Sequence, residues 1–329
     1  MQIARSLTEL EPLSGPSVVT IGNFDGVHCG HRMVIASVIA RAKTLGIRSA
    51  AITFDPHPAH VLHDGPRLPH ITPLPEKLAL LAETGLDLVL VLPFDADLRL
   101  WSARRFAERV LVQALHALEV HEGETFRFGH NAEADITDLG RLGQEFGFTV
   151  HAFQPVILRG APVSSSRIRK LIAAGDVSHA RALLGRPVSI LSTPASGRGY
   201  GTLYAVPTIN LAPYPELLPA NGVYVTTLKV GTGPNARSFR GATNAGNRPT
   251  FGADSFAVET HLLDFEPIAL TESTPLELTF LHRLRAEQRF ASPEALRAQI
   301  SLDVRHTQRY FALADALHAQ LHQASSAAS

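Results

Sequence analysis

The chain has 329 residues, of which 45% are hydrophobic and 18% charged, so it carries enough apolar surface to build packed cores in two domains. Its 30 basic and 30 acidic residues balance, and this excludes a net field that would hold a nucleic acid or an anionic membrane. No apolar run approaches the ~20 residues that span a bilayer, and the N-terminus lacks a signal-peptide core. Together with a single cysteine, Cys29, these features favour a cytoplasmic location.

The first half alternates short apolar runs with amphipathic stretches. We expect strands at 17–22, 49–54, 86–93 and 117–123, because these runs are rich in β-formers. Helices are expected at 31–45 and 74–84, each followed by a glycine, a usual helix stop. The pattern predicts a doubly wound α/β domain over residues 1–185.

The second half, residues 186–329, is richer in proline and glycine and has no helical pattern between its strand-like runs. Strands are expected at 222–230, 238–244, 257–265 and 276–284, which suit a small antiparallel barrel. Ser292 and Pro293 begin a final helix that runs past Ile300 and Phe311. The last seven residues, 323–329, are expected to fray.

A glycine-rich loop at 22–31, with the sequence GNFDGVHCGH, joins the first strand to the first helix. Free N–H groups at a helix start and small glycines suit a triphosphate. His28 and His31 can aim two imidazoles at the same phosphates and stabilise the charge that develops as pyrophosphate leaves. The alternatives are an ordinary tight connection, or a zinc site that uses His28, Cys29 and His31.

Two further segments carry groups that suit ATP. Ser164, Ser165, Ser166 and Arg167 offer hydroxyls and a guanidinium at a helix start, although a plain serine cap has the same pattern. In the second half, Thr208 and Asn210 place two oxygen ligands two residues apart on an extended chain, where they can share one Mg²⁺. An ordinary turn with a satisfied asparagine is the alternative.

These segments resemble the bacterial bifunctional riboflavin kinase/FMN adenylyltransferase (FAD synthetase) family. The adenylyltransferase resemblance rests on GNFDGVHCGH, on FDPHP at 54–58, on FRFGHN at 126–131 and on VSSSRIRKLIAAGD at 163–176. The kinase resemblance rests on PTIN at 207–210, GVYVTTL at 222–228, TNAGNRPTFG at 243–252 and VETHLLDF at 258–265. It implies a Rossmann-like nucleotidyltransferase domain followed by a riboflavin-kinase β-barrel with a C-terminal helix.

The resemblance also implies an activity and its ligands. The chain would phosphorylate riboflavin to FMN and adenylylate FMN to FAD, with ATP as co-substrate and Mg²⁺ as cofactor. No nucleic-acid or membrane partner is implied, and no oligomeric state.

The site residues that follow from motif and resemblance fall into four groups. The catalytic group is His28, His31 and Glu259, the last as the base for the riboflavin 5′-hydroxyl. ATP of the adenylyltransferase is assigned to Gly22, Asn23, Phe24, Asp25, Gly26, His28, His31, Ser164, Ser165, Ser166 and Arg167. Flavin is assigned to Phe54, Pro56, His57, Pro58, Thr125 and Arg248. Kinase ATP and magnesium are assigned to Gly197, Gly199, Gly201, Thr208 and Asn210, with Thr208 and Asn210 as the metal ligands.

The chain departs from the family pattern at two places. Thr125 stands where the family has Asn or Asp, and the 188–206 segment has Ala205 and Val206 in place of a glycine and an aromatic residue. Two alternatives therefore stay open: only the adenylyltransferase is active, or the chain is a catalytically impaired flavin-binding sensor. A third is that the chain adenylylates another phosphorylated substrate, because short HxGH motifs serve several acceptors. Asn244 and Arg248 either contact ligand or brace a loop. Oxidation of Cys29, between the two histidines, is expected to impair adenylylation.

Overall fold

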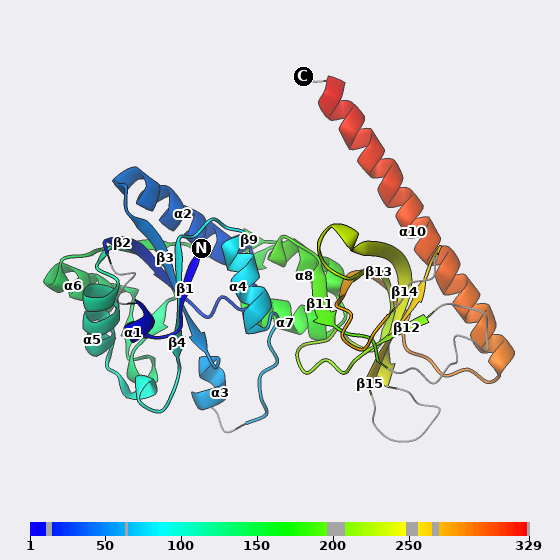
Figure 1. Cartoon of the computed structure of the whole chain (residues 1–329), viewed down its shortest axis with the longest axis horizontal. Coiled ribbons are helices and arrows are strands. Elements are labelled where there is room, and N and C mark those ends of the chain that lie inside the picture. Colours follow the sequence, from blue (N-terminus) through cyan, green and yellow to red (C-terminus); the bar gives the residue numbers. More distant parts are fainter. Residues whose placement is uncertain (11–14, 63–64, 196–207, 248–255, 265–269, 328–329) are drawn as a thin grey trace. The chain divides into compact units, whose positions relative to one another are not determined.

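A computed structural model describes residues 1–10, 15–62, 65–195, 208–247, 256–264 and 270–327 (Figure 1). The chain divides into two compact units, residues 1–167 and 168–329. Each unit is built around one six-stranded sheet. None of the helices in the described ranges has both the length and the apolarity that a bilayer crossing needs.

The sheet of the first unit is entirely parallel, with strand order β1-β4-β3-β2-β5-β8. Its strands are β1 (Gln2–Ala4), β2 (Ser17–Ile21), β3 (Arg48–Asp55), β4 (Leu88–Pro93), β5 (Ala117–Gly123) and β8 (Thr149–Phe153). Two small hairpins pair β6 (Arg127–Phe128) with β7 (Ala134–Asp135), and β9 (Ile157–Leu158) with β10 (Ala161–Pro162). The predicted α/β class and its four strands are confirmed.

Helices cover both faces of this sheet, because successive strand residues point to opposite sides. Val18, Ala51 and Val89 pack under α2 and α4, whereas their neighbours Val19 and Ala50 face the other helical layer. The helical segments of the unit are α1 (Leu7–Leu10), α2 (Cys29–Leu45), α3 (Pro58–Leu62), α4 (Leu74–Ala82), η2 (Leu98–Leu100), α5 (Ala103–Phe106), the π-helical η3 (Ala107–Ala114), η4 (His130–Ala132), α6 (Ile136–Phe146) and α7 (Ser165–Ala173), whose last six residues belong to the second unit.

Local signals fix the ends of α2. Its C-terminal cap is Gly46, whose φ of 66° is left-handed and whose N–H bonds to Ala42 and Lys43 carbonyls. The helix begins at Cys29, two residues before the predicted start, because the His28 side chain accepts the His31 N–H and so caps the first turn. A motif residue therefore also defines the helix start.

The second unit has an antiparallel sheet with order β11-β16-β13-β14-β15-β12, which confirms the predicted β-rich half. The sheet curls into a half-barrel, so that the chain after β11 meets the opposite edge strand where Pro194 pairs with Leu211. Its elements are β11 (Val188–Ser192), β12 (Thr208–Leu211), β13 (Gly222–Val230), η5 (Gly233–Asn235), β14 (Arg237–Asn247), β15 (Phe256–Leu262) and β16 (Leu276–Ala286), with α8 (Val177–Leu184) before them and α10 (Pro293–Ala327) after them.

The final helix is longer than expected. As predicted, Ser292 caps it by accepting the Ala295 N–H at 3.2 Å. Phe311 packs against Val225 of the sheet and Leu263, the residue after β15. The tail that was predicted to fray from residue 323 is instead helical to Ala327, because alanine and glutamine sustain a helix once the preceding turns are fixed. The end of α10 projects away from the sheet (Figure 1).

Candidate functional site

The carboxyl edge of the first sheet gathers the predicted adenylyltransferase motifs. From β2 the chain moves to β3 on one side, whereas β5 lies on the other side of β2. Ligands of open parallel sheets bind outside the strand ends at such a switch point. The 22–28 loop follows β2 and the 124–130 segment follows β5, so both lie at this switch point.

The loop between β2 and α2 has an unusual backbone. Phe24 and Val27 have φ values of 47° and 38°, a left-handed region that β-branched and aromatic residues rarely adopt. Both side chains are buried in the core beneath α2, and this burial holds the strained turn in place. Phe24, predicted to bind ATP, is therefore only 2% exposed and packs edge-on against His31.

Asp25 fastens this loop to a distant segment. Its buried carboxylate accepts the N–H groups of Ile71, at 3.0 and 3.2 Å, and Thr72, at 3.0 Å. The Thr72 hydroxyl in turn accepts the Gly26 N–H at 2.9 Å. Asp25, another predicted ATP ligand, thus uses its side chain to position the loop.

His28 and His31 lie face to face at the start of α2. Their ring centroids are 3.5 Å apart, and the planes differ by 14°. Nδ1 of His28 accepts the His31 N–H, whereas Nδ1 of His31 is buried and has no hydrogen-bond partner among the described residues. Burial, then the nearby His28 and Lys77 charges, holds the pKa of His31 well below its ordinary value of 6.5. The His31 imidazole is therefore neutral at pH 7.

Lys77 contacts the 22–28 loop, and the sequence analysis missed it. Its ammonium donates to the Asn23 carbonyl and to the Thr53 hydroxyl, each at 3.1 Å, although the residue is only 6% exposed. Burial lowers its pKa, and this effect is partly offset by Asp25 and Asp55. The available signal was a lysine on the apolar face of the 74–82 helix, beside Leu78 and Leu81.

The serine-rich start of α7 touches the loop, but its arginine points elsewhere. Ser165 Oγ donates to the Asp25 carbonyl at 2.8 Å, and Ser164 Oγ accepts the Arg167 N–H at 3.2 Å. Nη1 of Arg167 donates to three carbonyls of the β9–β10 hairpin, at 2.8 to 3.2 Å. Ser166 is exposed. Arg167 therefore braces a hairpin with the donors that the ATP prediction assigned to phosphates.

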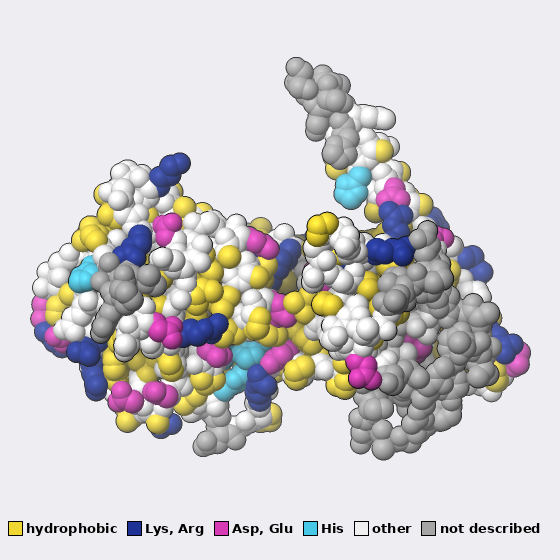
Figure 2. Space-filling view, viewed as in Figure 1, with side chains coloured by type: hydrophobic (Ala, Val, Ile, Leu, Met, Phe, Trp, Pro, Cys, Tyr) yellow, Lys and Arg dark blue, Asp and Glu magenta, His cyan; other side chains and the backbone are white. Residues whose placement is uncertain are grey.

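The predicted flavin residues of the first unit lie at the end of β3, just after it, and after β5. Phe54 packs edge-on against Phe94, Pro56 is exposed, and Pro58 begins α3. His57 accepts the Ala59 N–H and lies within 6 Å, ring to ring, of His60 and His70. Figure 2 shows histidine side chains gathered on the surface over α3. Thr125 is exposed in the turn after β5.

The second unit aligns the predicted kinase residues on one face of its sheet. In the strand register, Asn210 of β12 lies opposite Glu259 of β15, which lies opposite Asn244 of β14. Thr208, two residues from Asn210, pairs with His261 on the same face. This polar row comprises Thr208, Asn210, Asn244, Glu259 and His261, and every member is half-buried or exposed.

The opposite face of β14 and β15 belongs to a buried core that also includes β13. Thr226, Thr243 and Thr260 are fully buried and form a cross-strand ladder, with hydroxyl oxygens 2.7 and 2.8 Å apart. A shift of register by one residue would exchange this core face with the polar row. The ladder therefore fixes which side chains reach the accessible face.

Four predicted residues lie outside the described ranges, namely Gly197, Gly199, Gly201 and Arg248.

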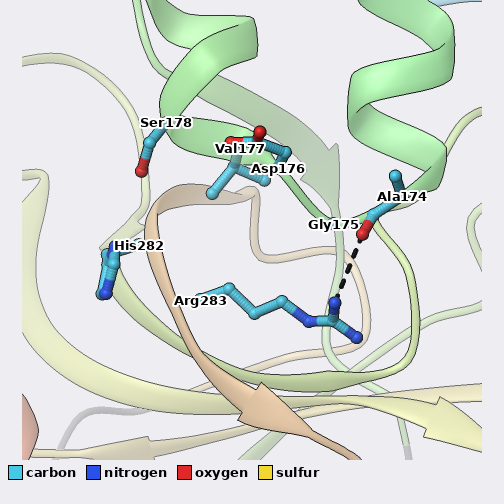
Figure 3. A pocket seen from close by; sticks show the side chains of 7 residues that line it. All are labelled: Ala174, Gly175, Asp176, Val177, Ser178, His282 and Arg283. Atoms are coloured by element: carbon cyan, nitrogen blue, oxygen red, sulfur yellow. Dashed lines mark hydrogen bonds between the residues drawn. The ribbon is translucent and has the colours of Figure 1, made fainter.

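A separate pocket of about 270 Å³ lies between the start of α8 and β16 (Figure 3). Arg283 crosses it and donates to the Ala174 carbonyl at 3.2 Å and to the Asn221 carbonyl at 2.6 Å. Asp176, at the opposite wall, caps α8 by accepting the His179 N–H at 3.1 Å. The charged groups of this pocket thus serve the fold, and none of the predicted site residues lines it.

Comparison with known proteins assigns a different family description to each half. A family model described as FAD synthetase matches residues 11–167, and one described as riboflavin kinase matches residues 184–311.

Full-length relatives combine the two descriptions. The chain is 38% identical over 309 residues to a bifunctional riboflavin kinase/FMN adenylyltransferase of Pseudomonas fluorescens, and the match covers 92% of this chain and 96% of that protein. It is 32% identical to the protein of the same name from Escherichia coli K12, over 95% of this chain and 99% of that one. A solved structure of a macrolide-efflux protein from Streptococcus pneumoniae shares the fold, with a TM-score of 0.81 at 26% identity over 93% of this chain and 98% of that one.

Proposed function

The chain belongs to the bifunctional riboflavin kinase/FMN adenylyltransferase family, and from this premise we propose how its residues divide the two reactions. The enzyme phosphorylates riboflavin to FMN and adenylylates FMN to FAD. ATP is the co-substrate, and its use supports a cytoplasmic location. We place the functional boundary between residues 185 and 186, where Gly185 ends α8 before β11 begins.

The adenylyltransferase proposal rests on one observation: Nδ1 of His31, at the start of α2, is buried and has no hydrogen-bond partner within the described part of the chain. A triphosphate at this helix start would meet the positive end of the helix dipole. Its negative charge would raise the pKa of His31, so the imidazole gains a proton as pyrophosphate charge develops. His28 orients the first turn, and Lys77 adds a fixed positive charge behind the loop.

The FMN phosphate is the nucleophile of this step. One of its oxygens forms a bond to the α-phosphorus of ATP while the bond to pyrophosphate breaks, so catalysis depends on aligning two anions. The edge near His57 and Pro58 is the proposed flavin side. Thr125, exposed after β5, contributes a hydroxyl where the family has Asn or Asp.

The kinase proposal rests on the polar row of the second sheet. Glu259 accepts the proton of the riboflavin 5′-hydroxyl as that oxygen attacks the γ-phosphorus and ADP leaves. The oxygen donors of Thr208 and Asn210 suit Mg²⁺, which prefers oxygen ligands and substrate phosphates. When bound there, the ion supplies charge neutralisation on the phosphates. Asn244, directly opposite Glu259, helps to orient its carboxylate.

The test is chromatographic analysis of products from riboflavin, ATP and Mg²⁺, with a parallel run that starts from FMN. His31→Ala is expected to lower FAD formation from FMN by about 100-fold or more, while FMN formation stays unchanged. Glu259→Gln is expected to lower FMN formation from riboflavin to a similar extent, while FAD formation from FMN stays unchanged. The matched controls are His318→Ala, on an exposed part of α10, and Glu277→Gln, on β16 of the second sheet.

The outcomes discriminate between the assignments. Equal losses in His31→Ala and His318→Ala would refute the histidine proposal, and equal losses in Glu259→Gln and Glu277→Gln would refute the glutamate proposal. FAD formed only from supplied FMN would mean that the kinase is inactive. If the chain binds flavin but forms neither FMN nor FAD, it is a sensor.

A further inference from the structure

Three ligating side chains converge at one edge of the first sheet, outside the loops described above. Glu119 and His121 are two residues apart on β5 and so project from the same face. His151 of β8 lies directly opposite His121 in the parallel register. Their imidazole centroids are 4.6 Å apart. None of the three belongs to the motifs of either reaction.

Two of the ligand-atom distances in this cluster match those that a bound metal would impose. Oε2 of Glu119 lies 3.3 Å from Nε2 of His121 and 3.3 Å from Nε2 of His151, and all three atoms lie within 4.8 Å of one another. Zinc binds imidazole nitrogen and carboxylate oxygen at ~2.0–2.2 Å in a tetrahedron, which puts neighbouring ligand atoms roughly 3.3–3.5 Å apart. We propose that Glu119, His121 and His151 form a Zn²⁺ site.

Neighbouring residues of α2 hold two of the ligands in position. Ser37 Oγ lies 2.9 Å from Nδ1 of His121, which leaves Nε2 to face the cluster. Arg41 binds the carboxylate of Glu119 chiefly through Oε1, at 2.7 and 2.8 Å, and its Nε also lies 2.9 Å from Oε2. Metal-ligating histidines and carboxylates usually have such hydrogen-bonded supports. The proposed ion would thus tie edge strand β8 and helix α2 to the sheet.

The exposure of the cluster suits metal uptake. Glu119 and His121 are buried, whereas 43% of the His151 side chain is exposed. An ion can therefore enter beside His151, and water can take the fourth position.

The ligand types select the class of metal. Two imidazole nitrogens and one carboxylate oxygen suit zinc and neighbouring transition metals, whereas Mg²⁺ and Ca²⁺ take oxygen ligands. The competing explanation is a metal-free network in which both imidazoles donate to Oε2 and Arg41 neutralises the carboxylate. The two explanations differ in whether the protein binds one equivalent of zinc through His151.

The experiment is equilibrium dialysis of the metal-free full-length chain against ZnCl₂ without ATP, which would chelate the ion. Parent, His151→Ala, His151→Cys and His318→Ala are compared. His151 is the most exposed ligand, so its replacement leaves the packed part of the cluster intact. Cysteine also ligates zinc, so it serves as a rescue, and His318 is an exposed histidine on α10. A parallel Co²⁺ titration reads the coordination from visible absorption.

At low Zn²⁺ concentration we expect the parent and His318→Ala to bind one more equivalent of Zn²⁺ than His151→Ala does. The affinity of this site for Zn²⁺ should fall at least ~10-fold when the His151 imidazole is removed. His151→Cys should restore it. Co²⁺ should give tetrahedral absorption in the parent, His318→Ala and His151→Cys, and not in His151→Ala. Zinc binding of the same stoichiometry and affinity in parent and His151→Ala overturns the proposal, and so does a parent that binds no zinc.

Discussion

Glu122, buried in the middle of the first sheet, makes the stability of the first unit depend on pH. Its Oε1 accepts the Thr20 hydroxyl at 3.1 Å and the Ile21 N–H, yet burial outweighs these bonds and raises the pKa of Glu122 from 4.5 to about 8. The folded chain therefore keeps a proton that the unfolded chain releases near pH 4.5. The stability that this group contributes is fully present below pH 4.5 and is lost as the pH rises through 8.

The size of the effect follows from the two pKa values. Each pH unit between them lowers the free energy of unfolding by about 1.4 kcal/mol, so the whole interval amounts to as much as about 5 kcal/mol. Glu122→Gln keeps an oxygen that can accept from Thr20 and Ile21 but has no proton to lose. The difference in unfolding free energy, variant minus parent, should therefore grow by about 1.4 kcal/mol per unit from pH 5 to pH 8.

Urea denaturation at pH values from 5 to 9, followed by tryptophan fluorescence, measures this difference. Trp101 is the only tryptophan of the chain and packs against the core of the first unit, so its signal reports on that unit. Glu124→Gln, at an exposed carboxylate two residues along, is the control and should follow the parent at every pH. A difference between Glu122→Gln and parent that stays constant across this range would refute the reasoning.

Three further predictions concern single side chains. Lys77→Met removes the buried ammonium behind the 22–28 loop, where we propose that ATP binds. It should lower FAD formation from FMN at least ~10-fold without changing FMN formation, as measured by product chromatography from either flavin. Asp25→Ala leaves the Ile71 and Thr72 N–H groups without their carboxylate and should lower the free energy of unfolding by ~2–5 kcal/mol in the Trp101 assay, with a smaller loss for Asp25→Asn. Phe280→Ala empties a fully buried position in the second sheet and should lower the free energy of unfolding by ~3–5 kcal/mol, measured by denaturation followed with circular dichroism. Leu191→Ala, at a side chain that is 48% exposed, should lower it by less than ~1 kcal/mol.

Much of the candidate site was predictable because its signals are local. His28 and His31 lie three residues apart across a helix start, and the strand and glycine before them specify that turn within one short segment. Thr208 and Asn210 lie on one face because they are two residues apart in a strand. The position of Glu259 came from resemblance, and its alignment with Asn210 came only from the strand register.

The sequence by itself determined the order of the elements, the two-part organisation and the motif residues, since helical and strand periodicities operate within short windows. Only the tertiary structure decided which distant groups meet. Lys77 joins Asn23, Asp25 binds the 71–72 backbone, Arg167 turns to a hairpin, and His151 meets His121. These contacts depend on strand order, register and helix packing, which are set by burial across the whole unit and leave no mark in the spacing of the residues along the chain.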